Sequence, residues 1–116
     1  MFLVVKFHTF DFMGAVENKQ ELVRIISSHG KEISTFGVKK IAVFGSFIKN
    51  NVTPNSDVDL IIEFDPNYKT LKNLYSLSQY LQNLFGRKVE IVTLQSLNPF
   101  TGKYIIQEAE YVAIAA

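Results

Sequence analysis

Residues 41–64 read IAVFGSFIKNNVTPNSDVDLIIEF, two apolar segments separated by a glycine-serine pair, a polar stretch and two aspartates. The first apolar segment, together with the three residues before it, predicts a short buried strand over residues 38–44 that ends at Gly45. Turn-forming residues crowd positions 50–56 and predict a loop. The second apolar segment predicts a strand over residues 58–64 that is covered on both faces of its sheet.

Helical spacing of apolar residues governs the segments on either side of these strands. Residues 17–36 predict one amphipathic helix, which ends at Gly37. Its apolar positions are Leu22, Ile26, Ile33 and Phe36. A break at residues 65–67 opens a second helix with apolar positions three and four apart, and Gly86 ends it. These positions are Leu71, Leu74, Ser78, Leu81 and Phe85.

The last third of the chain predicts a strand, a helix and a short final segment. Residues 87–93 alternate as a strand does, residues 96–110 predict a helix, and residues 111–116 form either a final strand or a packed tail. The resulting order, α-β-β-α-β-α, predicts an α/β (α+β) fold in which helices pack on a small mixed β-sheet. We expect residues 1–116 to form a single domain.

The apolar segment at residues 1–12 needs a separate explanation. Lys6 and Asp11 interrupt the unbroken apolar run that a secretory signal requires, and no stretch of the sequence is long and apolar enough for a membrane span. We therefore expect a cytoplasmic protein without membrane contact. An extra edge strand is the favoured interpretation of residues 1–12. The alternatives are a partner-binding arm and a misassigned start codon, since Met13 could be the true start.

Composition narrows the classes of function. The 116 residues carry 12 lysines and arginines against 11 acidic residues, so the net charge of +1 provides no general attraction for nucleic acid. The chain has no cysteine, which excludes a disulfide scaffold, a thiolate zinc site and a cysteine nucleophile. Hydrophobic residues make up 47% of the chain, which is enough for a packed core and too many for a disordered chain.

The first element of a candidate site is the Gly45-Ser46 turn after the first strand. Glycine lets the backbone come close to a ligand. A helix that opens at Ser46 would direct free N–H groups and a hydroxyl toward a phosphate. Taken alone, the pair is more simply explained as a plain strand-to-helix connection.

Three carboxylates supply the second element. Asp57 and Asp59 alternate with core residues at the head of the second strand, so they project from the same face. Glu90 lies in the middle of the third strand and joins them if the two strands are neighbours. We expect the three strands at residues 41–44, 58–64 and 89–93 to be neighbours in one mixed sheet. Mg²⁺ relieves the repulsion between such carboxylates, and three of them can hold two ions. Taken separately, each acid is also explained as a solvated side chain.

Together these features resemble the nucleotidyltransferase superfamily that includes DNA polymerase β. The shared pattern is Gly-Ser, ten intervening residues, Asp-x-Asp and a third carboxylate on a later strand. In this chain the pattern consists of Gly45, Ser46, Asp57, Asp59 and Glu90. The chain is most similar to the minimal nucleotidyltransferases, and the resemblance extends over residues 41–44, 60–65 and 86–92.

The resemblance implies a polymerase β-like fold, ATP as substrate, and catalysis by Asp57, Asp59 and Glu90, which would hold two Mg²⁺ ions. It also implies a set of residues that contact the nucleotide: Gly45, Ser46, Lys49 and Ser56. Two departures from the family pattern bear on activity. Residues 47–50 lack the arginines that the family often has after Gly-Ser, and Glu90 stands where aspartate is common.

The resemblance further implies a partner. Minimal nucleotidyltransferases commonly occur with a helical HEPN-domain toxin, to which they act as antitoxin by moving AMP from ATP to a tyrosine hydroxyl. Two alternatives stay open: a catalytically weak protein that neutralises its partner by binding alone, and a regulatory nucleotide sensor. An oligomer is compatible with all three. Phe47 and Ile48 lie beside the predicted site, and we expect them to be exposed and to contact the partner.

Overall fold

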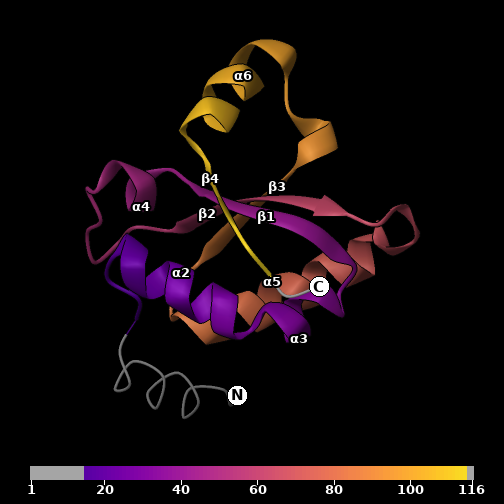
Figure 1. The fold of residues 1–116 in the computed structure, drawn as a ribbon, viewed down its shortest axis with the longest axis horizontal. Helices are drawn as coiled ribbons and strands as arrows, with labels where there is room; N and C mark the ends of the chain where they lie inside the picture. The colour runs from indigo at the N-terminus through magenta and orange to yellow at the C-terminus, as the bar shows by residue number, and fades with distance from the viewer. Residues whose placement is uncertain (1–14, 115–116) are drawn as a thin grey trace.

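A four-stranded sheet in the order β3-β2-β1-β4 organises residues 15–114, which the computed structural model describes (Figure 1). The strands are β1 (Val38–Phe44), β2 (Val58–Phe64), β3 (Val89–Thr93) and β4 (Glu110–Val112). β1 pairs with β2 and with β4 in antiparallel fashion, whereas β2 and β3 are parallel. The mixed sheet and the neighbouring positions of β1, β2 and β3 confirm the predicted fold class.

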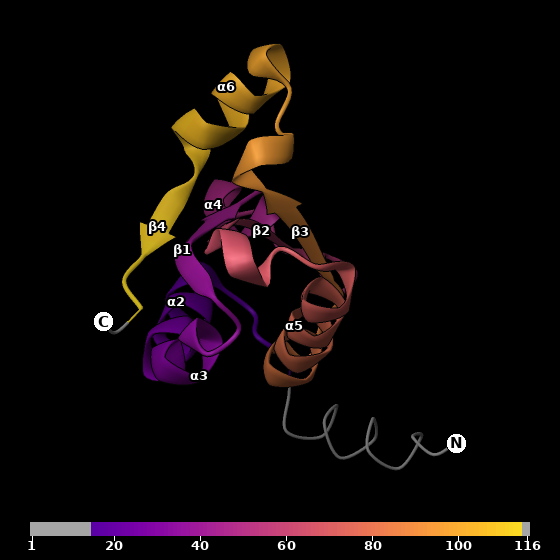
Figure 2. The same cartoon turned by 90° about the vertical axis from the view of Figure 1, so that its right-hand side faces the viewer.

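Helices cover the two faces of this sheet unequally. The helices are α2 (Lys19–Ser28), α3 (Gly30–Ser34), α4 (Ser46–Lys49), α5 (Leu71–Phe85) and α6 (Pro99–Glu108), with short 3-10 helices at Pro66–Tyr68 and Leu94–Ser96. α2, α3 and α5 lie together against one side of the sheet, and α6 lies on the opposite side (Figure 1, Figure 2). One face is therefore the helix-covered core face, while the other is more open.

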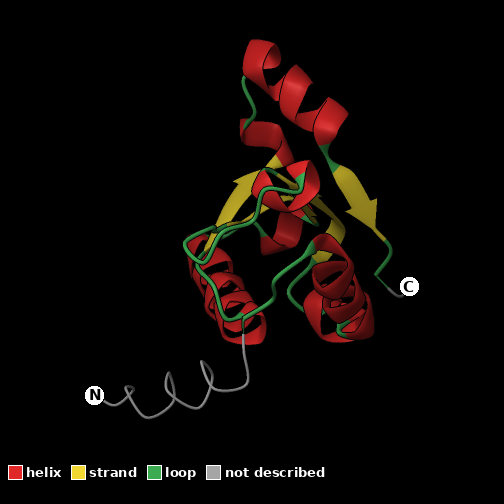
Figure 3. Cartoon of the chain, turned by 90° about the vertical axis from the view of Figure 1, so that its left-hand side faces the viewer, coloured by secondary structure: helices red, strands yellow, loops and turns green. Residues whose placement is uncertain are grey.

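The connections bring three strand ends to one edge of the sheet. β1 leads through α4 and a loop into the antiparallel β2, so the end of β1 lies beside the start of β2. Figure 3 shows the helices, strands and loops of the chain from another side. α5 crosses over between the parallel β2 and β3, so both of these strands start at that same edge. The register pairs Phe44 with Asp59, and Asp59 with Glu90.

Alternation along β2 separates the core face from the open face. Leu60 and Ile62 are fully buried in the core, where α2 contributes Leu22 and α5 contributes Leu77. Burial of each such aliphatic side chain contributes about 1.5–3 kcal/mol to folding. Asp59 alternates with these residues, so its half-buried side chain projects from the other face.

The prediction of one helix over residues 17–36 is wrong, because the helix breaks at His29 into α2 and α3. His29 has φ −110° and ψ 19°, outside the helical range. Ser28 Oγ donates a 3.0 Å hydrogen bond to the Ile25 carbonyl oxygen, which His29 Nδ1 also contacts at 2.9 Å. Such side-chain bonds compete with the helical backbone, and the following Gly30 is a poor helix former. The predicted apolar residues Leu22, Ile26 and Ile33 are nevertheless fully buried.

α5 confirms the second predicted helix and the burial of Leu81 and Phe85, and it also buries Leu77, which was not in the predicted stripe. Its fully buried side chains are Leu77, Leu81 and Phe85. Leu71, which we expected in the stripe, is 82% exposed. It is the first helical residue, directly after the N-cap Thr70, so the first turn extends beyond the core. Gly86 ends the helix in the left-handed conformation, as predicted.

The two ends of the chain bear on the remaining predictions about the fold. α6 is shorter than the predicted helix over residues 96–110, and β4 pairs with β1, so the strand alternative for the final segment is confirmed. The strand predicted for residues 1–12 lies outside the described residues and stays a prediction. Among the helices within residues 15–114, none is both long and apolar enough to cross a bilayer.

Candidate functional site

Gly45 forms the turn where β1 ends and α4 begins. Its φ of 77° and ψ of −146° are values that residues with a side chain rarely adopt. Its carbonyl oxygen accepts two 3.0 Å hydrogen bonds, from the backbone N–H groups of Ile48 and Lys49. A Cβ atom at this position would overlap the Asp59 carboxylate. Glycine is therefore required both for the backbone conformation and for the space next to an acid.

Asp59 and Glu90 form the acidic centre of this sheet edge. They are register partners in adjacent parallel strands, and their carboxyl groups lie within hydrogen-bonding reach of each other. The pKa of Asp59 is raised from its ordinary value of 3.8 to about 7. Burial is the largest cause, and the hydrogen bond with Glu90, the charge of Glu90 and the charge of Asp57 add to it.

Asp57 approaches this pair from the loop before β2. Its side chain is exposed, and its negative charge acts on Asp59. Within residues 15–114, no three acidic or histidine side chains stand close enough together to be ligands of one metal ion. The structure therefore brings Asp59 and Glu90 together, as expected for neighbouring strands. A ligand set that also includes Asp57 stays a prediction.

The charge of the Asp59–Glu90 pair suits a divalent cation. Two carboxylates at hydrogen-bonding distance repel each other unless a proton or a cation is shared between them. The raised pKa of Asp59 reflects that repulsion together with burial. Carboxylate oxygens are preferred ligands of Mg²⁺. The pair therefore fits a Mg²⁺ ion. Asp57 is a further carboxylate, and its negative charge acts on Asp59.

The residues predicted to contact the nucleotide take different positions around this pair. Ser46 is the first residue of α4 and is half-buried. Lys49 ends α4 and places its Nζ atom 3.7 Å from Glu108 Oε2 on α6. Ser56 Oγ accepts a 2.8 Å hydrogen bond from the backbone N–H of Thr53. Ser46 thus follows the turn beside the acids, Lys49 is engaged in an ion pair, and Ser56 closes a turn in the loop.

The expectation that Phe47 and Ile48 form an exposed contact for a partner is wrong. Phe47 is 1% exposed and belongs to the core, and Ile48 is half-buried against it. The guanidinium carbon of Arg87 lies 5.4 Å from the centroid of the Phe47 ring. The apolar residues of α4 therefore pack on the hydrophobic core.

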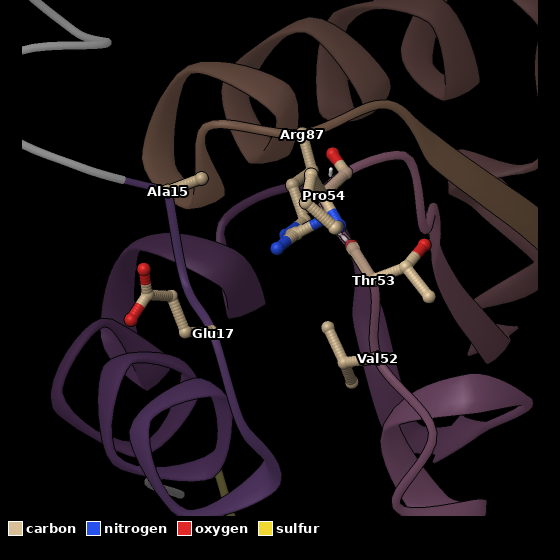
Figure 4. A pocket seen from close by; sticks show the side chains of 6 residues that line it. All are labelled: Ala15, Glu17, Val52, Thr53, Pro54 and Arg87. Atoms are coloured by element: carbon tan, nitrogen blue, oxygen red, sulfur yellow. Dashed lines mark hydrogen bonds between the residues drawn. The ribbon is translucent and has the colours of Figure 1, made fainter.

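Arg87 is the residue near the site that the sequence pattern did not indicate. Its Nε donates a 2.6 Å hydrogen bond to the Val16 carbonyl oxygen, and its Nη1 donates to the carbonyl oxygens of Thr53 and Ser56 at 2.9 and 2.8 Å. It also borders a cavity of about 320 Å³ (Figure 4). This cavity is lined by Ala15, Glu17, Val52, Thr53, Pro54 and Arg87. The sequence contains one indication of this role: Arg87 is one of two arginines in the chain and directly follows Gly86, where the predicted helix ends.

Known proteins resemble this chain over most of its length. The model of the nucleotidyltransferase domain family matches residues 19–112. Protein adenylyltransferase MntA of Thermococcus cleftensis is 35% identical over 94 residues, which cover 80% of this chain and 94% of the relative. A Methanocaldococcus jannaschii protein named "Putative protein adenylyltransferase MJ1379" is 36% identical over 95 residues, which cover 79% of this chain and 95% of the relative.

Solved structures share the same fold. One described as "Structure of putative minimal nucleotidyltransferase" superimposes with a TM-score of 0.68 at 26% identity, covering 80% of this chain and 94% of that chain. A toxin-antitoxin structure with AMP-PNP superimposes with a TM-score of 0.59 at 19% identity, covering 77% of this chain and 73% of that chain. Since the matched residues 19–112 include the Gly45 turn and all three carboxylates, this chain belongs to the nucleotidyltransferase domain family and is a nucleotidyltransferase.

Proposed function

We propose that this nucleotidyltransferase is a Mg²⁺-dependent protein adenylyltransferase, which moves AMP from ATP to a tyrosine hydroxyl of a HEPN-type toxin and so acts as its antitoxin. The observation that carries the proposal is the pairing of the half-buried Asp59 with the exposed Glu90 beside the Gly45 turn. The two relatives described above support a protein as acceptor, because both are named for adenylyl transfer to proteins.

Asp57, Asp59 and Glu90 are the residues that would hold Mg²⁺, and three carboxylates suit two ions. When bound, Mg²⁺ lowers the pKa of an attacking hydroxyl and neutralises charge on a departing pyrophosphate. The raised pKa of Asp59 supports this assignment, because a half-buried carboxylate next to a second carboxylate needs a proton or a cation.

The residues around the turn would bind the triphosphate. Glycine lets the backbone of this turn come close to a phosphate, while the Asp59 carboxylate fills the space where a Cβ atom of residue 45 would lie. The Ser46 hydroxyl is a donor for a phosphate oxygen. Lys49 adds a positive charge, which its ion pair with Glu108 partly offsets. Ser56 contributes by holding the turn that leads into the acids.

The transfer is a displacement at the α-phosphorus of ATP. The acceptor oxygen forms a bond to the α-phosphorus while the bond from that phosphorus to the oxygen bridging to the β-phosphate breaks. Pyrophosphate leaves with the bridging oxygen. The proton of the acceptor hydroxyl passes to a carboxylate, and Asp59 and Glu90 are the candidates.

The toxin and the compartment are the parts of the proposal that depend most on similarity. The fold neighbour with AMP-PNP is a toxin-antitoxin structure, which motivates a toxin as the acceptor here. The HEPN type and the tyrosine follow from the resemblance to minimal nucleotidyltransferases. Because ATP is the AMP donor, we place the reaction in the cytoplasm.

ATP labelled in different phosphates tests the proposal. With the purified chain, a HEPN-type toxin and Mg²⁺, α-phosphate label should transfer to a toxin tyrosine, and EDTA should abolish the transfer. Label in the γ-phosphate should leave with pyrophosphate, so the toxin should stay unlabelled. Labelling by γ-labelled ATP, or the lack of labelling by α-labelled ATP, would contradict the proposal.

One observation favours a second candidate, a protein that neutralises the toxin by binding alone. The cation nearest in sequence to the turn, Lys49, is paired with Glu108, and residues 47–50 contain no arginine. In this case wild type and an Asp59→Asn variant would inhibit the toxin equally, and neither would label it. The two candidates are therefore separated by comparing inhibition with labelling.

A further inference from the structure

The Arg87 side chain joins three segments that are distant in sequence. Its guanidinium group donates hydrogen bonds to Val16, before α2, and to Thr53 and Ser56, in the loop before β2. The same group lies over the ring of Phe47 in α4. Figure 4 shows the side chain reaching from the start of the β3 segment toward this loop.

Two of these segments, and the strand of Arg87 itself, adjoin residues of the candidate site. The Ser56 carbonyl group, which accepts a 2.8 Å hydrogen bond from Arg87, belongs to the residue before Asp57. Phe47 comes two residues after Gly45, and Arg87 itself comes three residues before Glu90. One guanidinium group therefore connects the loop of the first acid, the helix after the glycine turn and the strand of the third acid.

We propose that Arg87 is a positioning residue for the nucleotidyltransferase site. It fixes the turn at residues 53–56 and α4 relative to β3, and thereby holds Asp57 and the Gly45 turn around the Asp59–Glu90 pair. The expected effect of Arg87 on the rate of AMP transfer rests on the proposed function. Its expected effect on the order of the loop at residues 53–56 does not depend on that function.

The chemistry of the contacts explains why an arginine stands here. Several backbone carbonyl groups converge on one side chain from different directions, and an apolar ring lies beneath it. A planar guanidinium group donates from several nitrogens at once and stacks on an aromatic face, whereas a lysine ammonium is a single point of donation. Since two of these bonds are partly buried, loss of the donor would leave carbonyl groups without a partner.

Arg87→Gln, Arg87→Lys and Arg24→Gln form a matched set of variants. Arg24 is the other arginine of the chain and is exposed on α2, so Arg24→Gln removes the same charge away from the site. Two readouts are compared below the unfolding temperature. They are amide hydrogen exchange of residues 50–57 and of α5, and the separate kcat and KM values for ATP in AMP transfer.

A positioning role predicts a local effect on the loop and a specific effect on kcat. In Arg87→Gln, exchange of residues 50–57 should accelerate while α5 keeps its protection, and kcat should fall roughly tenfold or more with a smaller change in KM. Arg87→Lys should show the same effects to a smaller degree, and Arg24→Gln should match wild type. Unchanged exchange and unchanged kcat in Arg87→Gln would overturn the proposal.

Two further outcomes must be distinguished from failure of the proposal about Arg87: an inactive wild-type protein and a variant that does not fold. If wild type transfers no AMP, the proposed function fails, and loop exchange alone decides whether Arg87 positions the loop. If Arg87→Gln does not fold, Arg87→Lys decides with the same readouts. Loss of protection throughout α5 in Arg87→Lys would show a general structural role and overturn the proposal.

Discussion

The close pairing of Asp59 with Glu90 and the raised pKa of Asp59 both result from the positions of these residues in the sheet. The register sets them side by side, and the missing side chain of Gly45 leaves room next to Asp59. The sequence predicts which residues take part, because strand alternation and spacing are visible in it. It does not predict the raised pKa of Asp59, which depends on burial by segments that are distant in the chain.

This raised pKa predicts a pH dependence of stability for the metal-free protein. Folded Asp59 keeps its proton up to about pH 7, whereas the unfolded chain releases it near the ordinary pKa of 3.8. The stability that this proton contributes is present below about pH 4 and is lost as the pH rises toward 7. Asp59→Asn removes the loss, so in EDTA the variant should unfold at a higher temperature than wild type at about pH 8.

Glu63→Gln provides the control for this measurement. Glu63 lies further along the same face of β2, and its replacement should leave the decline of the unfolding temperature between pH 4 and 7 in place. The account of Asp59 would be contradicted if Asp59→Asn showed the same decline as wild type.

Gly45→Ala tests the space beside the carboxylate. An alanine at a φ of 77° and a ψ of −146° is strained by about 1–3 kcal/mol, and its Cβ atom would also overlap Asp59. We expect a larger loss in the free energy of unfolding than the strain alone, measured by urea denaturation. Because Asp59→Ala removes the overlapping group, the double variant should be more stable than the sum of the two losses implies. Additive losses would argue against the overlap.

Strands and helices differ in how well the sequence predicts them. β1 and β2 begin and end where we expect, because turn-forming residues bound their apolar runs. The long helix over residues 17–36 breaks at His29, where local side-chain bonds outweigh the periodic pattern. Burial of Phe47 is not predicted, since the four-residue α4 is too short to show a period.

α6 carries the exposed apolar side chains that Phe47 and Ile48 do not provide, and its last turn is joined to α4. Phe100 and Tyr104 are 82% and 67% exposed, and Glu108 of the same helix pairs with Lys49 of α4. A toxin that presents a hydroxyl to Asp59 would approach α4 and therefore α6. Phe100→Asp combined with Tyr104→Asp should weaken toxin binding in a calorimetric titration, because burying an unpaired charge is unfavourable.

α5 supplies the matched control for this surface. Leu71 and Tyr75 are 82% and 65% exposed, but they follow the opposite end of β2 from the site. Leu71→Asp combined with Tyr75→Asp should leave toxin affinity unchanged. Equal weakening by both double variants would show that the toxin does not bind specifically beside α6.

At the scale of the whole molecule, the strand order β3-β2-β1-β4 places sequence motifs from β1, β2 and β3 next to one another in one site. The sequence predicts β1, β2 and β3 as neighbours, and the structure confirms this arrangement. The contacts of Arg87 with Val16 and Ser56 span 71 and 31 positions, and no local pattern predicts pairs so distant. Motif spacing thus identifies the acids, whereas the residue that connects their supporting segments emerges only from the folded chain.

The central claim is that Asp59 and Glu90 carry out AMP transfer. The most direct test is the single-turnover rate of AMP transfer to the toxin, with Mg²⁺ and saturating ATP, for Asp59→Asn, Glu90→Gln and the control Glu63→Gln. The account predicts that each site variant lowers the rate by about a hundredfold or more, since each removes charge that stabilises the transition state, while Glu63→Gln matches wild type. A wild-type rate in Asp59→Asn or Glu90→Gln would contradict it.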